Sequence, residues 1–349
     1  IFGIFVFVSL FFQGVCQERA VDSTKKFVPG DFVMEHIQDA YMWHITDLGS
    51  HKLTIPLPII LYSKISGWKI FSSTKLESGT YQGYHLSENG IYKGKLVENV
   101  MDSNGKPQEL RPMDFSITKD VISLFVVTFL LLFVFITIGN RYRKNPNVAP
   151  HGVQNLFEPI IIFVRDEIAI PSIGPERYKK FMPFLLTVFF FIWFSNLLGI
   201  IPLFPGGANL TGNITITMLL ALVVFVITTV STNKGYWIEI FNNPEIPWWL
   251  KFPIPLMPLV EFTGVITKPV ILMIRLFANI LAGHMVAIVF FSLIFIFGQM
   301  SVAAGYGFSV LTIFFTVFMT LLELLVAFIQ AYVFTMLSAI YFGMAKVDL

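Results

Sequence analysis

An arginine stands inside one of the most apolar stretches of the chain. Arg275 lies in PVILMIRLFANILAGHMVAIVFF, where apolar residues follow it for several helical turns. Near the middle of a membrane span an arginine costs about 2.5–3.5 kcal/mol even on a lenient scale, and it stays protonated at any ordinary pH. A charge kept at that cost favours a functional role. The alternatives are a snorkelling side chain or a structural ion pair, and Lys268, two turns earlier, leaves the depth of Arg275 open.

Four other polar residues lie in this apolar segment or in the next one along the chain. Asn279 lies one helical turn after Arg275 and on the same face, whereas His284, nine residues on, points roughly to the opposite side. Glu323 and Gln330 are seven residues apart, so they share one face of a later helix. His284 and Glu323 form a candidate protonatable pair, because both titrate near neutral pH when desolvated. The alternatives are a hydrogen-bonded structural histidine and, for Asn279 and Gln330, polar contacts that join helices.

The composition indicates a membrane protein. Of 349 residues, 55% are hydrophobic and only 13% are charged, and the mean hydropathy is +0.72. A soluble domain cannot bury that much apolar surface, so we predict several membrane spans. The formal net charge of +2 gives no indication of a nucleic-acid partner. We find no Walker loop, dinucleotide turn or nucleophile elbow that would indicate an enzyme.

The first part of the chain differs from the rest. Residues 1–16 (IFGIFVFVSLFFQGVC) resemble the apolar region of a signal peptide, with a retained anchor as the alternative. Residues 17–115 carry charges, Gly, Ser and Asn around two short apolar runs, and we predict a small exported region with some β structure. His36, Asp39 and His44 could suggest a metal site. Their loose spacing and the lack of a fourth ligand favour surface polar residues, so we expect no metal and no cofactor.

Residues 116–349 are predicted to form the membrane domain. DFSIT (114–118) offers N-cap candidates before an apolar run over 117–138. Arg141, Arg143 and Lys144 follow that run, which places its end in the cytoplasm and the N-terminal region outside. We predict an interfacial helix over 154–174, further spans over 181–203, 213–229, 265–297 and 310–341, and an interfacial or re-entrant piece over 235–258.

The fold class expected from this pattern is an all-α polytopic membrane protein with about five membrane helices. The last two segments exceed the length of a perpendicular crossing, so we expect them to be long and tilted. Five spans place the C-terminus, with Lys346, in the cytoplasm. The small exported N-terminal region of mixed structure completes the expected fold.

RLFANILAGH resembles the corresponding segment of subunit a of F-type ATP synthases. The family motif is an arginine followed by Leu, a variable residue, a small residue and Asn, as in Arg275–Asn279 here. The resemblance runs from about residue 114 to the end and includes 181–203, NITITMLLAL and the helix with Glu323 and Gln330. Family members often have small residues where this chain has Ile271 and Met273. The long exported region is not general to the family, although it is similar to that of members from the Bacteroidetes group.

The resemblance implies a role for each of the five polar residues. Arg275 would face the c ring and pair with its carboxylate, with Gln330 close by on the neighbouring helix and Asn279 lining the same path. His284 and Glu323 would line the entry half-channel, with the histidine first in the chain and the acid second.

The resemblance also implies the setting of the protein. It would be a non-catalytic, proton-conducting stator subunit in a bacterial inner membrane, with the c ring, subunit b of the peripheral stalk and the lipid bilayer as partners. A secondary transporter that binds an anion through Arg275 is one alternative, but its usual paired internal repeats are not found. A structural anchor for the exported region is another, and it would tolerate substitution of Arg275.

Overall fold

The computed structural model describes residues 39–48, 51–76, 79–87, 92, 94–101, 107–144, 149–201, 206–208, 210–242 and 256–345. The chain divides into two compact units, one reaching to Ser123 and the other built mainly from Leu124 onward. The predicted signal segment with Cys16, the candidate ligand His36 and the C-terminal Lys346 lie outside the described residues.

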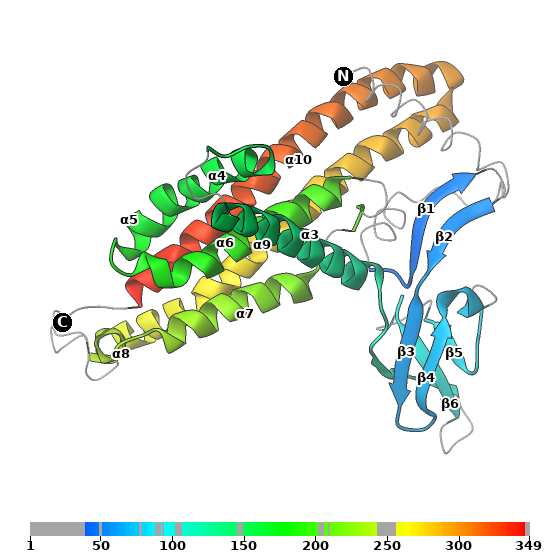
Figure 1. Ribbon diagram of the computed structural model, residues 1–349. Coiled ribbons are helices and arrows are strands. Elements are labelled where there is room, and N and C mark those ends of the chain that lie inside the picture. The colour runs from blue at the N-terminus through cyan, green and yellow to red at the C-terminus, as the bar shows by residue number, and fades with distance from the viewer. Residues whose placement is uncertain are drawn as a thin grey trace. The chain divides into compact units, whose positions relative to one another are not determined.

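The N-terminal unit is built of antiparallel strands (Figure 1). One sheet pairs β1 with β2, a second has the order β4-β3-β8, and a third has the order β5-β6-β7. The two short apolar runs of this region, residues 52–63 and 68–73, fall almost entirely in β2, β3 and β4. The bounds are β1 Met42–Leu48, β2 His51–Pro56, β3 Pro58–Ser63, β4 Gly67–Ser72, β5 Tyr84–Leu86, β6 Leu96–Met101, β7 Pro107–Leu110 and β8 Met113–Asp114, with a 3-10 helix η1 at Ser73–Leu76.

Alternating side chains give this unit its core. Ile59 and Leu61 of β3 are fully buried, and Phe71 of β4 packs on the same side. Tyr84 and Leu96 close the core from the third sheet. The period-two pattern therefore places one face of β3 and β4 inward, as expected for a half-buried antiparallel sheet.

The first membrane helix, α3 (Lys119–Lys144), is capped from a distance. The backbone N–H of Asp120 donates to Asp39 Oδ1 at 3.2 Å, and Lys119 N–H donates to the carbonyl of Ala40 at 3.1 Å. The side-chain cap expected from DFSIT therefore comes instead from Asp39, which supplies the acceptor that the first helical N–H groups lack. Asp39, considered as a metal ligand on sequence, thus has a structural contact.

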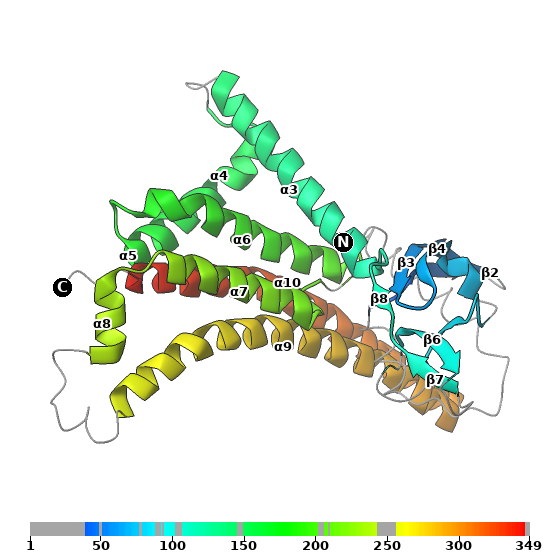
Figure 2. The same ribbon diagram turned by 90° about the horizontal axis from the view of Figure 1, so that it is seen from below.

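The membrane unit is helical throughout its described elements. α9 has 45 residues and α10 has 43, which gives lengths of about 68 and 65 Å at 1.5 Å per residue. The two helices run side by side in opposite directions, joined at Ser301 (Figures 1 and 2). The bounds are α4 Val153–Phe163, the π-helix η3 Val164–Ala169, α5 Ile170–Ile173, α6 Tyr178–Ile200, the 3-10 helix η4 Leu210–Gly212, α7 Ile214–Val230, α8 Lys234–Asn242, α9 Leu256–Met300 and α10 Val302–Met344.

Four helices of the described chain are long and apolar enough to cross a membrane. They are Lys119–Lys144, Tyr178–Ile200, Pro258–Gly283 within α9, and Tyr306–Met344 within α10. The fifth predicted span is α7, whose 17 residues measure about 26 Å, a little less than a hydrocarbon core of about 30 Å. Four of the five predicted spans are therefore confirmed as helices of spanning length, and the fifth remains a prediction.

Helix α6 forms the centre of this unit. Half of the apolar stretch of α6 is buried, whereas only 11% of the apolar stretches of α9 and α10 is buried. Its Phe189 and Phe190 are fully buried, and the Phe189 ring lies edge-on to Phe328 of α10, with ring centroids 5.7 Å apart. Edge-on aromatic pairs stabilise such contacts beyond simple area burial. α10 is therefore held on one side by α6, while much of α9 and α10 stays uncovered.

The predicted interfacial segments are helical where described. The run expected over 154–174 forms α4, η3 and α5, and Arg165 of η3 donates two hydrogen bonds to Asp166, at 2.7 and 3.1 Å. These bonds lower the pKa of the exposed Asp166 carboxyl below its usual value. The piece expected over 235–258 contains α8, and its residues 243–255 lie outside the described chain.

Candidate functional site: the hairpin of α9 and α10

Two stacked phenylalanine pairs define how α9 and α10 align. Phe290 stacks on Phe315 with centroids 5.1 Å apart and planes 1° apart, and Phe297 stacks on Phe308 at 3.7 Å and 2°. A step of seven residues forward on α9 thus matches seven residues back on α10. The hairpin keeps one antiparallel register over this length.

The same register places Gln330 level with Arg275. Arg275 is fifteen residues before Phe290, and Gln330 is fifteen residues after Phe315. Gln330 is only 5% exposed, whereas Arg275 is exposed on the open flank of α9. The two predicted partners therefore share one level of the hairpin, with the amide inside and the guanidinium facing outward.

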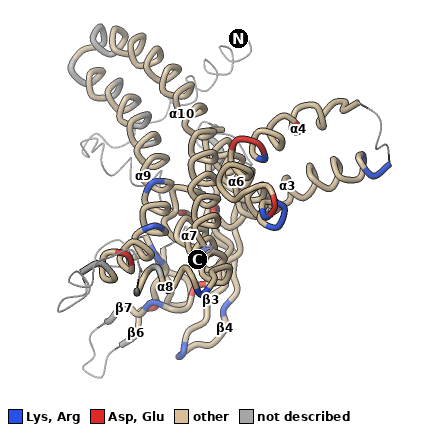
Figure 3. Tube along the Cα trace, turned by 90° about the vertical axis from the view of Figure 1, so that its left-hand side faces the viewer, with Lys and Arg blue, Asp and Glu red and all other residues tan. Residues whose placement is uncertain are grey.

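Arg275 has no acid of its own chain nearby among the described residues. The ion pairs there are His85 with Glu109 and Arg165 with Asp166. Helices α9 and α10 carry few charges (Figure 3), and Glu323 is the only acidic residue of α10. The positive charge at Arg275 is thus exposed in apolar surroundings, with no counter-ion among the described residues of the chain.

Glu323 lies against the backbone of α9 at Gly283. A Cβ at Gly283 would sit 3.1 Å from Glu323 Oε1 and 3.4 Å from its Cγ, so the absent side chain makes room for the carboxylate. His284 is the next residue along α9, although its side chain lies outside the described set. Glu323 and the backbone at His284 are therefore brought together, about two turns and 12 Å along α9 from Arg275.

Asn279 stands between these two levels. It is exposed, one turn beyond Arg275 on the same flank of α9. Of the five predicted residues, Arg275 and Asn279 share the exposed flank, Gln330 is buried at the level of Arg275, and Glu323 contacts α9 beside His284.

A buried polar pair between α6 and η4 was not singled out from the sequence. Thr211 Oγ1 donates to Asn196 Oδ1 at 2.5 Å, and Asn196 Nδ2 donates to the carbonyl of Ala327 at 3.4 Å. Asn196 and Thr211 are 2% and 1% exposed. Ala327 lies between Glu323 and Gln330 on α10, so this pair fixes α10 between its two polar positions. A lone Asn in an apolar span is the signal that could have found it.

The arginine also belongs to a stripe of charges on α9. Glu261, Lys268 and Arg275 follow one another at seven-residue intervals, which keeps them on one face of the helix. Lys268 Nζ lies 5.7 Å from the ring centre of Tyr341, and both residues line a small cavity with Thr228 and Thr229. Polar groups therefore continue from Arg275 toward the N-terminal end of α9, away from Glu323.

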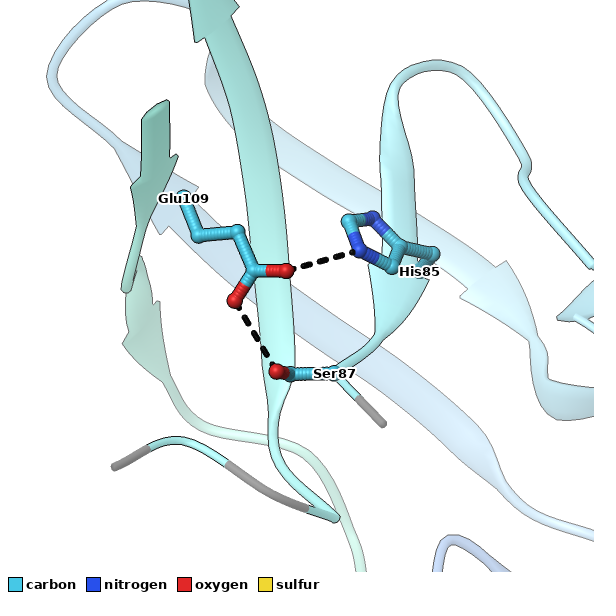
Figure 4. Close-up of polar contacts among 3 residues, drawn as sticks. All are labelled: His85, Ser87 and Glu109. Atoms are coloured by element: carbon cyan, nitrogen blue, oxygen red, sulfur yellow. Dashed lines mark hydrogen bonds and ion pairs between the residues drawn. The ribbon is translucent and has the colours of Figure 1, made fainter. Parts of the chain in front are cut away.

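One Ser, His and Glu set in the N-terminal unit does not have the arrangement of a nucleophilic triad. Ser87 Oγ donates to Glu109 Oε2 at 2.9 Å, and His85 Nε2 lies 3.4 Å from Glu109 Oε1 (Figure 4). The acid meets both partners, whereas a triad requires the histidine to stand between the hydroxyl and the acid. Glu109 of β7 instead links β7 to His85 of β5 and to Ser87 just after it, on the far side of β6.

Comparison with known proteins identifies the relatives of both parts. The family described as ATP synthase A chain matches residues 121–343, and a domain of unknown function, DUF8433, matches residues 32–115. ATP synthase subunit a of Chlorobium phaeobacteroides (strain DSM 266) is 41% identical over 275 residues, which cover 75% of this chain and 74% of the relative. ATP synthase subunit a of Myxococcus xanthus is 43% identical over 239 residues, covering 67% and 74%.

Proposed function

The chain belongs to the ATP synthase A chain family, and on that premise we propose that Arg275 is the fixed charge of its proton path, facing a carboxylate on a ring of c subunits. Subunit a is the ion-conducting, non-catalytic, membrane-embedded component of F0. The proposal concerns how this chain conducts: two aqueous half-channels meet the ring on either side of Arg275.

The exposed guanidinium is the observation that carries this proposal. An uncompensated arginine in a span is costly, and the described chain offers it no carboxylate within ion-pair distance. An external carboxylate at about 4 Å would attract it by about 4 kcal/mol at an effective dielectric constant of 20. A partner anion outside this chain is thus the simplest source of compensation, and the uncovered flanks of α9 and α10 leave room for it.

Two sets of polar groups support the half-channels. The entry path would use Asn279, His284 and Glu323, since Glu323 lies against Gly283. The exit path would follow Lys268 and Glu261 at the other end of the same stripe. Arg275 stands between the two sets: along the helix, Gly283 beside Glu323 is about 12 Å away on one side and Lys268 is about 10.5 Å away on the other.

The proton moves because charge state decides where the ring carboxyl can travel. A proton from the entry path neutralises the carboxylate, which can then turn into lipid, because the charged form is what burial penalises most. Near Arg275 the ionised form is favoured, so the proton leaves by the exit path. Each charge crossing the membrane yields about 2.3 kcal/mol per 100 mV. The fixed charge also keeps the two paths from joining into one proton wire.

The proposed setting is a bacterial inner membrane crossed five times. In this arrangement α3, α6, α7, α9 and α10 are the spans, the N-terminal region is periplasmic and the C-terminus is cytoplasmic. The basic C-terminal end of α3 and the basic start of α6 support this orientation, because Lys and Arg stay on the cytoplasmic side. The c ring and the b subunits of the peripheral stalk are the expected partners.

Replacing Arg275 tests the proposal. We expect Arg275→Ala to abolish ATP-driven proton pumping by the reconstituted complex, while ATP hydrolysis by the catalytic head continues. Acid quenching of a fluorescent dye in liposomes measures pumping, and co-purification of the c ring confirms assembly. Arg165→Ala, which removes an exposed arginine outside the spans, should pump normally. Normal pumping by Arg275→Ala would refute the assignment.

A further inference from the structure

The sheet β4-β3-β8 has an apolar face on each side. Ile59, Leu61 and Phe71 fill the inner face and are almost fully buried. On the reverse face, Trp68 and Ile70 of β4 are 61% and 73% exposed. An antiparallel sheet with one covered face usually presents polar residues on the other. The outer apolar face therefore indicates a surface that meets something other than bulk water.

The outer face continues along the chain that leads into α3. Phe115 N–H donates to the Ile60 carbonyl at 2.9 Å, and Ile117 N–H donates to the Pro58 carbonyl at 3.1 Å, so residues 113–117 run beside β3. Met113 and Phe115 are 57% and 56% exposed. Every second residue from Met113 to Ile117 is thus apolar and on one side.

The polar residues of this run face the other way. Asp114 Oδ2 accepts a hydrogen bond of 2.5 Å from the Tyr41 hydroxyl, and Ser116 Oγ accepts one of 3.1 Å from Ile60 N–H. Burial and the neighbouring Asp114 raise the pKa of Tyr41 far above its ordinary value. These bonds hold the run in register, so the apolar residues keep a common orientation.

The first turn of α3 is also held by the segment that precedes β1. The bonds from Lys119 N–H to Ala40 and from Asp120 N–H to Asp39 fasten the first helical turn to the N-terminal unit. Phe115 stands four residues before Lys119, within about 14 Å of it even if that chain were fully extended. Because α3 is a membrane-spanning candidate, the apolar face begins where the bilayer surface must be.

The residues of the face match that location. The rings of Tyr62 and Trp68 are 5.1 Å apart, and those of Trp68 and Phe115 are 5.6 Å apart, forming one aromatic row. Trp and Tyr gather at membrane–water interfaces because their rings are apolar with a polar edge. The β3–β4 turn adds an exposed Ile65 beside an exposed Lys64, whose amine can reach lipid phosphates while its stem stays in the apolar layer.

We propose that the face formed by Tyr62, Trp68, Ile70, Met113 and Phe115 docks into the headgroup region of the lipid bilayer beside the start of α3. Lipid is favoured over a protein partner because the face is continuous with the membrane helix through Phe115 and Ile117. This inference rests on α3 crossing the membrane and does not depend on the role of Arg275.

Spin labels in the intact complex test the docking. Cys16→Ser removes the chain's natural thiol, and Ile70→Cys and Ile65→Cys each add one label site on an exposed side chain. We expect labels at both sites, in complexes reconstituted in liposomes, to favour dissolved oxygen over a water-soluble nickel agent severalfold more than a label at Asn99. Asn99→Cys is the matched control, since Asn99 is exposed on β6, in the sheet that does not carry the face. Equal accessibility at all three sites would overturn the proposal.

A photoreactive side chain distinguishes lipid from protein. Benzoylphenylalanine in place of Trp68, activated in the same liposomes, should form adducts with phospholipid. An adduct with another protein chain, or with a second copy of this chain, would overturn the choice of lipid as the occupant. The proton-pumping assay of Arg275→Ala is a separate readout from the lipid adduct at Trp68. The proposed role of Arg275 and the docking of the sheet can therefore fail independently of each other.

Discussion

The substitution Gly343→Ala should separate α5 from α10. A Cβ at Gly343 would lie 2.0 Å from the carbonyl oxygen of Ser172 and 3.1 Å from its carbon. Ordinary contacts begin at 3.4 Å, so the two helices must move apart by about 1.4 Å. The obstacle is backbone, which cannot rotate away as a flexible side chain can. Ile173, beside Ser172, is 3% exposed and would lose part of its packing.

The expected cost is large for a single methyl group. Overpacking costs about 1–3 kcal/mol, and a backbone clash belongs at the upper end. Alanine is favoured over glycine inside a helix by about 1 kcal/mol, which offsets part of this. The net loss of about 2 kcal/mol corresponds to a roughly thirtyfold shift in the docking equilibrium between α5 and α10.

Hydrogen exchange measures that shift directly. In the purified complex, amides of peptides covering residues 170–180, including the Gly174 N–H bonded to Ile170, should exchange up to about thirtyfold faster in Gly343→Ala. Gly139→Ala in α3 is the control, because nothing lies within 4 Å of the added carbon. Unchanged exchange in Gly343→Ala would show that the close approach at Ser172 does not constrain the fold.

Three further substitutions have distinct readouts. Glu323→Ala should slow proton pumping without stopping it at every pH, and an unchanged rate across the pH range would contradict the entry-path role proposed for Glu323. Asn196→Ala should lower the free energy of unfolding by about 1–3 kcal/mol because Thr211 loses its buried acceptor, and adding Thr211→Val should recover part of that loss; no recovery would argue against the pair. Tyr41→Phe should cost about 1.5 kcal/mol at neutral pH by removing the donor to Asp114. Because the folded pKa of Tyr41 is raised above the unfolded value of about 10, that contribution is complete below pH 10 and is lost as the pH rises further, so a stability difference that stays constant to high pH would refute this account.

Hydropathy predicted the long helices, because the apolar runs exceed what a soluble fold needs. Spacing along one helix also predicted which polar residues share a face, such as Glu323 with Gln330. It could not predict which residue of α9 meets which residue of α10. That depends on where the chain reverses, at the single residue Ser301. One residue more or less in that turn would move Gln330 away from the level of Arg275.

Other features could not be predicted because they depend on contacts between segments that are far apart in the sequence. The cap of α3 comes from Asp39, 81 residues before Asp120, so no local pattern around DFSIT could reveal it. Gly283 and Gly343 look like ordinary glycines in apolar helices, where each weakens the helix by about 1 kcal/mol. Only the structure shows why a side chain would not fit at these positions. The carboxylate of Glu323 lies close to Gly283, and the backbone of Ser172 lies close to Gly343.

The fixed register of the hairpin decides which acid can neutralise Arg275. Glu323 is held at Gly283, about 12 Å away along α9, where two unit charges attract by about 1.4 kcal/mol at an effective dielectric constant of 20. A carboxylate arriving from outside to about 4 Å would be attracted by about 4 kcal/mol, nearly 3 kcal/mol more than Glu323 at its distance. A glutamate placed one turn from Arg275 would remove that advantage and hold the charge permanently. Keeping the acid two turns away therefore leaves the guanidinium available to a carboxylate from outside the chain, as the proposed role of Arg275 requires.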